Sequence, residues 1–159
     1  MNAQVRPEPL VAIEPLPPFR AIFGQLRALH RMHWDETEAY RDSVFSPRYD
    51  LLEHYFERGI ARGWGAFHGE KLVGHVTVYV TTSVHTGEQI ATEDALYVMP
   101  EYRRGIGARL IKRMLSDLKR DGVAELWATT RPGTRVGPLL ERLGMKHVAN
   151  NYHIRLGAK

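Results

Sequence analysis

The fold of this 159-residue chain is decided by the stretch Tyr97-Val98-Met99-Pro100-Glu101-Tyr102-Arg103-Arg104-Gly105-Ile106-Gly107-Ala108-Arg109-Leu110. It begins at the end of an apolar, strand-prone run and passes through a tight basic loop that contains two glycines. After the loop, apolar residues recur at three- and four-residue spacing, which predicts a helix with one buried stripe. That stripe consists of Ile106, Leu110, Ile111, Met114, Leu115 and Leu118. Gly122 is a typical end for such a helix.

A strand, a glycine turn and a helix N-terminus together make a typical anion site. The first amides of a helix have no helical partner, and the helix dipole favours negative charge there. Gly105 and Gly107 allow a phosphate to approach the backbone, while Arg103 and Arg104 add charged donors. The pattern therefore predicts a phosphate or pyrophosphate cradle; the alternative is a tight loop whose arginines are only solvated. A P-loop is disfavoured because the motif Gly-x-x-x-x-Gly-Lys-Ser/Thr is absent. A dinucleotide-binding fold is disfavoured because Leu110 stands where the third glycine of Gly-x-Gly-x-x-Gly would be.

The same stretch, from Val98 to Ile111, resembles the acetyl-coenzyme A signature of the GNAT N-acetyltransferase superfamily. The later Leu139–Met145 resembles the family's second landmark, a short helix ending in Leu-Gly-Phe. The order and spacing of the two match the small single-domain bacterial and phage members. The resemblance implies an α/β (α+β) fold, with a mixed, mostly antiparallel central sheet and helices on both faces.

The resemblance also implies acetyl-coenzyme A as the acyl donor, with loop amides and an arginine on its pyrophosphate. The residues that it assigns to cofactor binding are Tyr97, Val98, Arg103, Arg104, Gly105, Ile106, Gly107 and Ala108.

Two positions depart from the family pattern. The loop is one residue short, so either Arg103 reaches the pyrophosphate from a tighter turn or Arg104 replaces it. Leu140 stands where many relatives carry the Tyr that protonates the departing thiolate. The resemblance places the last strand region near that sulfur, and Tyr152 is therefore our candidate for the missing acid. Its other interpretation is an ordinary strand aromatic.

The composition limits the class of protein. The chain has no cysteine, which excludes a disulfide framework, a thiolate zinc site and a cysteine nucleophile. No segment is long enough to span a membrane, and the N-terminus does not resemble a signal peptide, so we expect a cytoplasmic protein. The net charge is +4, and the densest basic cluster coincides with the glycine loop, so we interpret this charge as attraction for an anionic cofactor. The motifs typical of nucleic-acid-binding proteins are missing, so we expect no nucleic-acid partner.

We expect a flexible N-terminus over residues 1–9 and a single domain over 10–159. Within that domain, Pro15, Pro17 and Pro18 end a first strand and begin a helix, and Ser46-Pro47 predicts the start of a second helix that Gly63 ends. Further strands are expected at 64–68, 72–82, 90–98 and 124–130, a short helix at 136–143, and a last strand region at 147–156.

Acetyl transfer to an amine requires a base, because an alkylammonium with a pKa of about 10.4 is almost wholly protonated at pH 7. Glu93 and Asp94 begin the strand before the glycine loop, where relatives place such a base. Strand alternation puts Asp94 on the face of Leu96 and Val98, and Glu93 on the other face. Asp94 is the favoured catalytic base, Glu93 the alternative, and Glu36 and Glu38 are further candidates; a solvated pair of carboxylates is the remaining interpretation.

The function that the resemblance implies is transfer of an acetyl group from acetyl-coenzyme A to an amine of a small molecule or peptide. The alternative is a noncatalytic acyl-coenzyme A binding module with a regulatory or assembly role. The eight histidines show no typical ligand spacing, so we expect no metal site. We expect a monomer or homodimer, and no residue identifies the acceptor.

Overall fold

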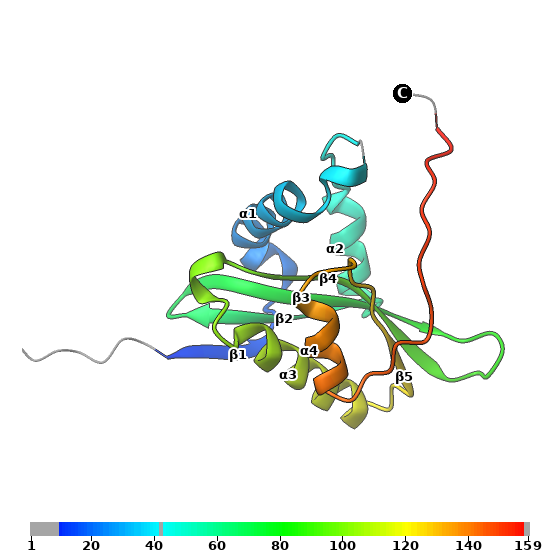
Figure 1. Ribbon diagram of the computed structural model, residues 1–159. Helices are drawn as coiled ribbons and strands as arrows, with labels where there is room; N and C mark the ends of the chain where they lie inside the picture. Colours follow the sequence, from blue (N-terminus) through cyan, green and yellow to red (C-terminus); the bar gives the residue numbers. More distant parts are fainter. Residues whose placement is uncertain (1–9, 42, 158–159) are drawn as a thin grey trace, which may run out of the picture.

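The computed structural model describes residues 10–41 and 43–157, so the predicted N-terminal tail 1–9 lies outside the described residues. The helices pack around one central sheet (Figure 1). In chain order the elements are β1 (Val11–Pro15), α1 (Phe19–Thr37), η1 (Ala39–Arg41), α2 (Tyr49–Glu57), β2 (Ala61–His68), β3 (Lys71–Thr82), β4 (Gln89–Val98), η2 (Pro100–Tyr102), α3 (Ile106–Arg120), β5 (Glu125–Trp127) and α4 (Val136–Arg142).

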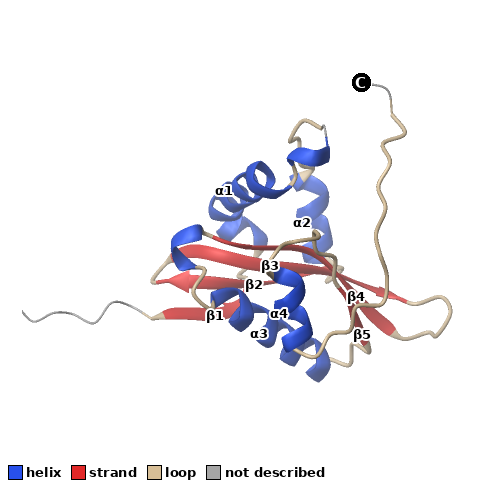
Figure 2. Ribbon diagram, in the orientation of Figure 1, coloured by secondary structure: helices blue, strands red, loops and turns tan. Residues whose placement is uncertain are grey.

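The strands form one five-stranded sheet in the order β1-β2-β3-β4-β5. The first four strands are antiparallel neighbours, whereas β5 pairs with β4 in parallel. That parallel pairing covers only Ile90–Thr92 of β4, opposite Glu125–Trp127. The rest of β4 therefore extends past β5 with an unpaired edge, and Figure 2 shows the two strands diverging there.

Helices cover both faces of the sheet, as the resemblance predicts. One core lies between the sheet and α3; its buried residues are Trp64, Ala66, Val73, Val76, Val78, Ala91, Val98, Ile106, Leu110, Ile111, Met114 and Leu118. A smaller core lies on the other face, against α1; its buried residues are Phe19, Ile22, Leu26, Leu29, Leu72 and Tyr97. The predicted stripe of α3 is the apolar face of the first core, and Gly122 ends this helix with φ 83°. Burial of these apolar surfaces supplies the main driving force for the fold.

A buried carboxylate fixes α3 to the sheet. Asp117 accepts a hydrogen bond from the indole Nε1 of Trp64 at 2.7 Å, and others from Arg113 at 2.9 Å and Arg120 at 3.0 Å. On the same helix, Arg109 and Arg113 donate to the backbone carbonyls of β1. Part of the positive charge that the sequence suggested for cofactor attraction therefore holds the edge strand in place.

Two sequence expectations about the second helix are wrong, namely where it begins and where it ends. The second helix begins at Tyr49 rather than at Ser46-Pro47, and it ends at Glu57, before Gly59 with φ 68°. Gly63 is instead a strand residue of β2, where a Cβ would lie 2.5 Å from Leu16. Gly63 thus packs closely against the Leu16 side chain, and the sequence alone cannot distinguish such a packing position from a helix end.

The expected last strand region at 147–156 is also wrong. Residues 145–156 form neither helix nor strand, and in Figure 1 this segment runs past β5 and away from the sheet. Side chains connect this segment to the rest of the protein; for example, the Asn151 amide donates to the Thr129 hydroxyl at 2.9 Å. Without a neighbouring strand, an alternating pattern of apolar residues does not form a sheet.

Within the described residues, no helix has the length and apolar character required to cross a membrane.

Candidate active site

The site is organised around a β-bulge in β4. Thr77 of β3 pairs with Ala95, and the next residue, Val78, pairs with Glu93, which leaves Asp94 as an extra residue. Asp94 therefore lies with Ala95 on the α1/α2 side of the sheet, and Glu93 lies with Leu96 on the α3/α4 side. Simple alternation predicted the reverse assignment, which is wrong. A bulge changes the strand's phase by one residue, and this bulge determines the face to which each carboxylate points.

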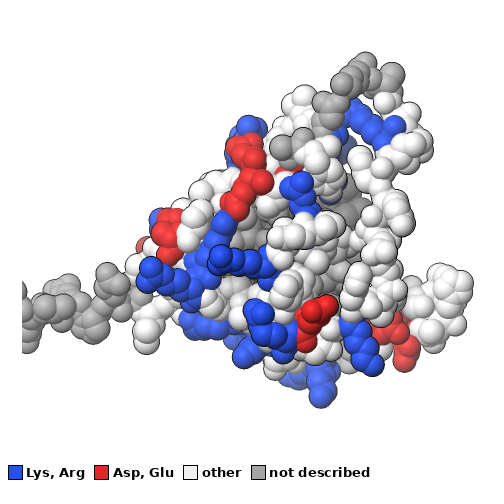
Figure 3. Space-filling model, in the orientation of Figure 1, with Lys and Arg blue, Asp and Glu red and all other residues white. Residues whose placement is uncertain are grey.

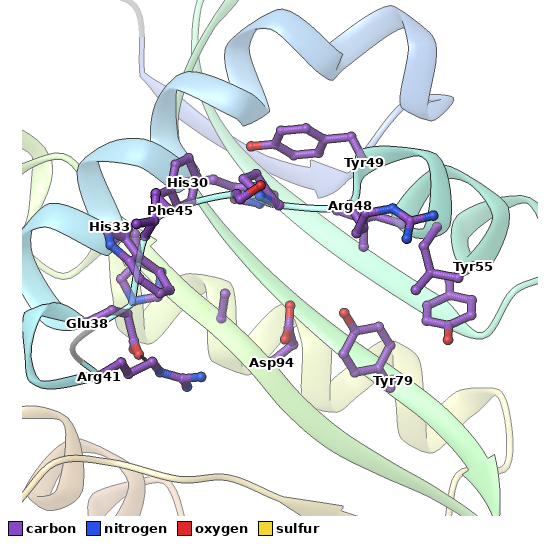
Figure 4. Close-up of a pocket in the computed structure, with 17 residues that line it drawn as sticks. His30, His33, Glu38, Arg41, Phe45, Arg48, Tyr49, Tyr55, Tyr79 and Asp94 are labelled. Carbon is purple, nitrogen blue, oxygen red and sulfur yellow. Dashed lines mark hydrogen bonds and ion pairs between the residues drawn. The ribbon is translucent and has the colours of Figure 1, made fainter. Parts of the chain in front are cut away.

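Asp94 lies at the floor of a cavity of about 430 Å³ between the sheet, α1, α2 and the segment that joins these helices. Figure 4 shows the Asp94 carboxylate and the Tyr79 side chain rising from the strands into this space. The full lining consists of His30, His33, Trp34, Glu38, Arg41, Val44, Phe45, Ser46, Pro47, Arg48, Tyr49, Leu51, Leu52, Tyr55, Tyr79, Asp94 and Ala95. This volume accommodates a small molecule or the end of a peptide.

The surroundings of Asp94 favour a proton acceptor of increased basicity. Partial desolvation in the cavity raises the pKa of its carboxyl, and the charge of Glu38 acts in the same direction. The Thr77 hydroxyl donates to it at 3.3 Å and opposes the increase in pKa, as do the Tyr79 hydroxyl and the charge of Arg41. Burial and the nearby Asp94 charge raise the pKa of Tyr79 to about 12, so this phenol stays protonated beside the carboxylate.

Glu93 faces a different environment on the opposite side of the sheet. It is half-buried where β4 and β5 separate, in a small space that it shares with Leu126, Thr129 and Leu140. Burial raises the pKa of its carboxyl to about 7, although the backbone amide of Thr129 opposes this. Glu93 is therefore partly protonated at neutral pH. It lies in the same space as Leu140, the position at which relatives carry their acidic Tyr.

The N-terminus of α3 has the geometry of a diphosphate cradle. Gly105 adopts φ 84° and caps the helix with no side-chain hydrogen bond, and the first intrahelical amide bond runs from Arg109 to Gly105. Within the described chain, the amides of Ile106, Gly107 and Ala108 have no acceptor. A Cβ at Gly105 or Gly107 would meet no atom within 4 Å, so the space above these amides is open. Three free amides beneath open space fit the pyrophosphate of coenzyme A.

The two loop arginines differ in their contacts. Arg103 donates to the Val98 carbonyl at 2.9 Å and to Glu36 at 2.6 Å, and its guanidinium lies 5.5 Å from the centre of the Tyr97 ring. Arg104 forms no hydrogen bond or ion pair with any residue that the structure describes, and it is exposed. Figure 3 shows basic side chains gathered on the face that includes α3. Arg104 is thus available for an anion, whereas Arg103 connects the loop to α1.

The remaining predicted cofactor residues lie along β4. Tyr97 has its side chain buried against α1 and the ring of His33, at a centroid distance of 5.4 Å. Val98 packs in the α3 core. Their side chains are therefore structural, and the unpaired backbone edge of β4 beyond Thr92 is the part of these residues that a ligand can contact.

The structure does not bring Tyr152 to this site. Its side chain is 94% exposed, in the C-terminal segment without regular structure, and it is absent from the lining of the cavity. The site instead includes residues that the sequence analysis did not identify, notably Arg41, Tyr55 and Tyr79. Tyr79 shares the phase of Thr77 on β3, but the sequence carried no signal for the bulge that aligns both with Asp94.

A family model for GNAT acetyltransferases matches residues 28–145, which include the bulge, the glycine loop and α4. The chain belongs to the GNAT acetyltransferase family. A search of curated proteins found no match. The expected fold class is confirmed by this match and by the mixed, mostly antiparallel sheet.

Solved structures of other acetyltransferases are similar to this GNAT chain. An aminoglycoside acetyltransferase from an uncultured soil metagenomic sample, solved with sisomicin, has a TM-score of 0.71 and 20% identity, over 91% of this chain and 96% of its own. A second soil metagenomic aminoglycoside acetyltransferase has a TM-score of 0.75 and 18% identity, over 93% and 99%. The ribosomal-protein-alanine N-acetyltransferase of Brucella melitensis biovar Abortus 2308 has a TM-score of 0.67 and 23% identity, over 92% and 100%. At these identities the likeness shows a shared fold.

Proposed function

We propose that this protein transfers an acetyl group from acetyl-coenzyme A to a primary amine of a small molecule or peptide, by direct attack. The observation that carries the proposal is the β4 bulge. It directs one carboxylate into a small-molecule cavity and the preceding carboxylate to the opposite face, where the strands diverge. A donor and an acceptor can thus approach the same strand from different sides.

Asp94 is the proposed base. The acceptor ammonium has a pKa of about 10.4 and must lose a proton before it can attack. Asp94 lies in the cavity, has a raised pKa, and forms no ion pair with the residues described. It can therefore hold the ammonium by charge and then accept its proton, directly or through one water.

Glu93 is the proposed acid. As the new N–C bond forms and the C–S bond breaks, the electron pair of the latter leaves with the sulfur, and the nitrogen releases its second proton to solvent. A protonated Glu93 carboxyl can supply the proton that this sulfur takes up, and solvent then returns both carboxyl groups to their starting states. The shared space with Leu140 supports this role, because the acid is missing at that position.

The amides of Ile106–Ala108 and the Arg104 guanidinium would hold the pyrophosphate of the donor, and the unpaired edge of β4 would accept its extended arm. Bound acetyl-coenzyme A supplies an activated thioester. No described group of three or more His, Asp or Glu side chains is arranged to hold a metal ion.

The test is release of free coenzyme A from acetyl-coenzyme A, measured against a panel of amines, with mass spectrometry of the acetylated product. Amine-dependent release is expected, with loss of that release in Asp94→Asn. Tight acetyl-coenzyme A binding without release by any amine would instead support a noncatalytic acyl-coenzyme A binding module.

A further inference from the structure

The cavity with Asp94 at its floor is where we place the acceptor, and we call it the acceptor cavity. Each charged side chain that lines it, apart from Asp94, is paired with an opposite charge. Four formally charged side chains line it: Glu38, Arg41, Arg48 and Asp94. Glu38 forms an ion pair with Arg41, and Arg48 forms two hydrogen bonds with Asp50, at 2.8 and 2.5 Å. Asp94 is thus the one lining carboxylate that forms no ion pair with a described residue, although the charge of Arg41 acts on it from a greater distance. With the other three charges paired, the cavity offers one carboxylate for a single positive charge.

The two histidines of the lining add no charge at neutral pH. Burial lowers the pKa of His30 to about 4, and burial also lowers the pKa of His33. Behind them, His75 is fully buried with its ring centre 5.0 Å from that of His30, and neither ring nitrogen has a partner within the described chain. Burial lowers its pKa far below the usual range as well. This wall of the cavity is therefore neutral.

The remaining wall is largely apolar and combines aromatic rings with aliphatic side chains such as Leu51 and Leu52. The rings that line the cavity belong to Trp34, Phe45, Tyr49, Tyr55 and Tyr79, and all five residues are half-buried. Tyr55 and Tyr79 meet edge to face at a centroid distance of 5.8 Å, next to Asp94 (Figure 4). The rings of Trp34 and Phe45 lie 5.5 Å apart. Partly covered ring faces favour a flat apolar group, and rings next to a carboxylate also favour the ammonium itself.

Tyr49 contributes its ring, and not its hydroxyl, to this wall. The ring stacks on His30 at 5.8 Å, whereas the hydroxyl oxygen is fully buried and has no hydrogen-bond partner among the described residues. Tyr49 therefore adds apolar surface to the cavity and no polar contact for a ligand.

We propose that the acceptor is a primary amine with a single positive charge joined to an aromatic or similarly flat apolar group. This inference rests on the proposed function. The ammonium lies at Asp94 and the flat group lies among the aromatic rings. Polycations such as aminoglycosides, which are named for two of the similar structures, do not match a cavity with one unpaired carboxylate.

The experiment compares three acceptors with the full chain and saturating acetyl-coenzyme A. 2-Phenylethylamine has one charge and a ring, ethanolamine has one charge without a ring, and kanamycin has several charges. We expect kcat/KM for 2-phenylethylamine to exceed that for each of the others by at least about tenfold, which corresponds to about 1.4 kcal/mol, because its ring gains buried contact with the aromatic side chains. Calorimetry with 2-phenylethylamine gives a second readout that does not depend on turnover.

Variants locate the binding in the cavity. Phe45→Ala should raise KM for 2-phenylethylamine by about tenfold and leave that for ethanolamine nearly unchanged. Val84→Ala, which shortens an apolar side chain that is 93% exposed in the β3–β4 connection, should change neither. A preference for kanamycin or ethanolamine would overturn the inference and leave the acetyltransferase in place. Failure of every amine would refute the proposed function instead.

Discussion

Glu93 gives a prediction that can be tested without any substrate. Its carboxyl has an ordinary pKa of 4.5 in an unfolded chain and a pKa of about 7 in the folded protein, because burial disfavours the charged form. Between these values the folded protein holds a proton that the unfolded chain has released. The free energy of unfolding must therefore fall as the pH rises through this range.

The magnitude follows from the two pKa values. Each tenfold change in proton affinity corresponds to about 1.4 kcal/mol, so Glu93 should remove roughly 2 to 3 kcal/mol of stability between pH 5 and pH 8. Glu93→Gln has nearly the same shape and no ionisation, so this part of the pH dependence should disappear. At pH 8 the variant should be more stable than the wild type, and at pH 5 the difference should be small.

The assay is urea unfolding of both proteins at pH 5 and pH 8, with Glu88→Gln as a control. Glu88 is an exposed residue of the β3–β4 connection, so its substitution should produce no such change with pH. A Glu93→Gln stability difference that is the same at both pH values would show that Glu93 ionises normally. Our assignment of Glu93 as a protonated donor would then lose its basis.

Further substitutions test the other parts of the site. Asp94→Asn should lower kcat by about 10²- to 10⁴-fold and leave the affinity for acetyl-coenzyme A unchanged. The wild-type rate should fall as the pH drops below the raised pKa of Asp94, because the base is then protonated; steady-state kinetics across pH check both results. Arg104→Ala should weaken acetyl-coenzyme A binding by about tenfold, as measured by calorimetry, because a charge-assisted donor is lost. Tyr152→Phe should match the wild-type turnover if Glu93 is the donor, whereas slower turnover with unchanged affinity would assign the acid role to Tyr152. Asp117→Ala should destabilise the fold by about 2 to 4 kcal/mol in thermal unfolding, since it leaves the Trp64 indole without its acceptor.

The sequence predicted the elements whose signal is local. The spacing of apolar residues predicted α3 and its buried stripe, Gly122 marked its end, and the glycine loop indicated where the helix begins. The long β-branched run became β3. In these segments the local preference and the packing in the folded protein agree, which is why the sequence was sufficient.

The incorrect predictions depend on contacts between distant residues. The phase of Asp94 is determined by the pairing of β4 with β3, and nothing in Thr92-Glu93-Asp94 marks the extra residue. The contact of Arg103 with Glu36 could not be predicted either, because the two residues are 67 positions apart in the chain; the role of Arg103 in cofactor binding stays a prediction. The C-terminal segment carries a strand-like alternation that has no neighbouring strand to pair with.

The most direct test of the account is calorimetric titration of acetyl-coenzyme A into the wild type, Gly107→Glu and Gly24→Glu. Both glycines are helical, and a Cβ at either would meet no atom within 4 Å, so each substitution should be tolerated by the fold. Only position 107 would place a carboxylate beside the free amides of α3. The account predicts that Gly107→Glu abolishes binding and that Gly24→Glu binds like the wild type. Equal affinity in all three folded proteins would show that the donor does not bind at this helix.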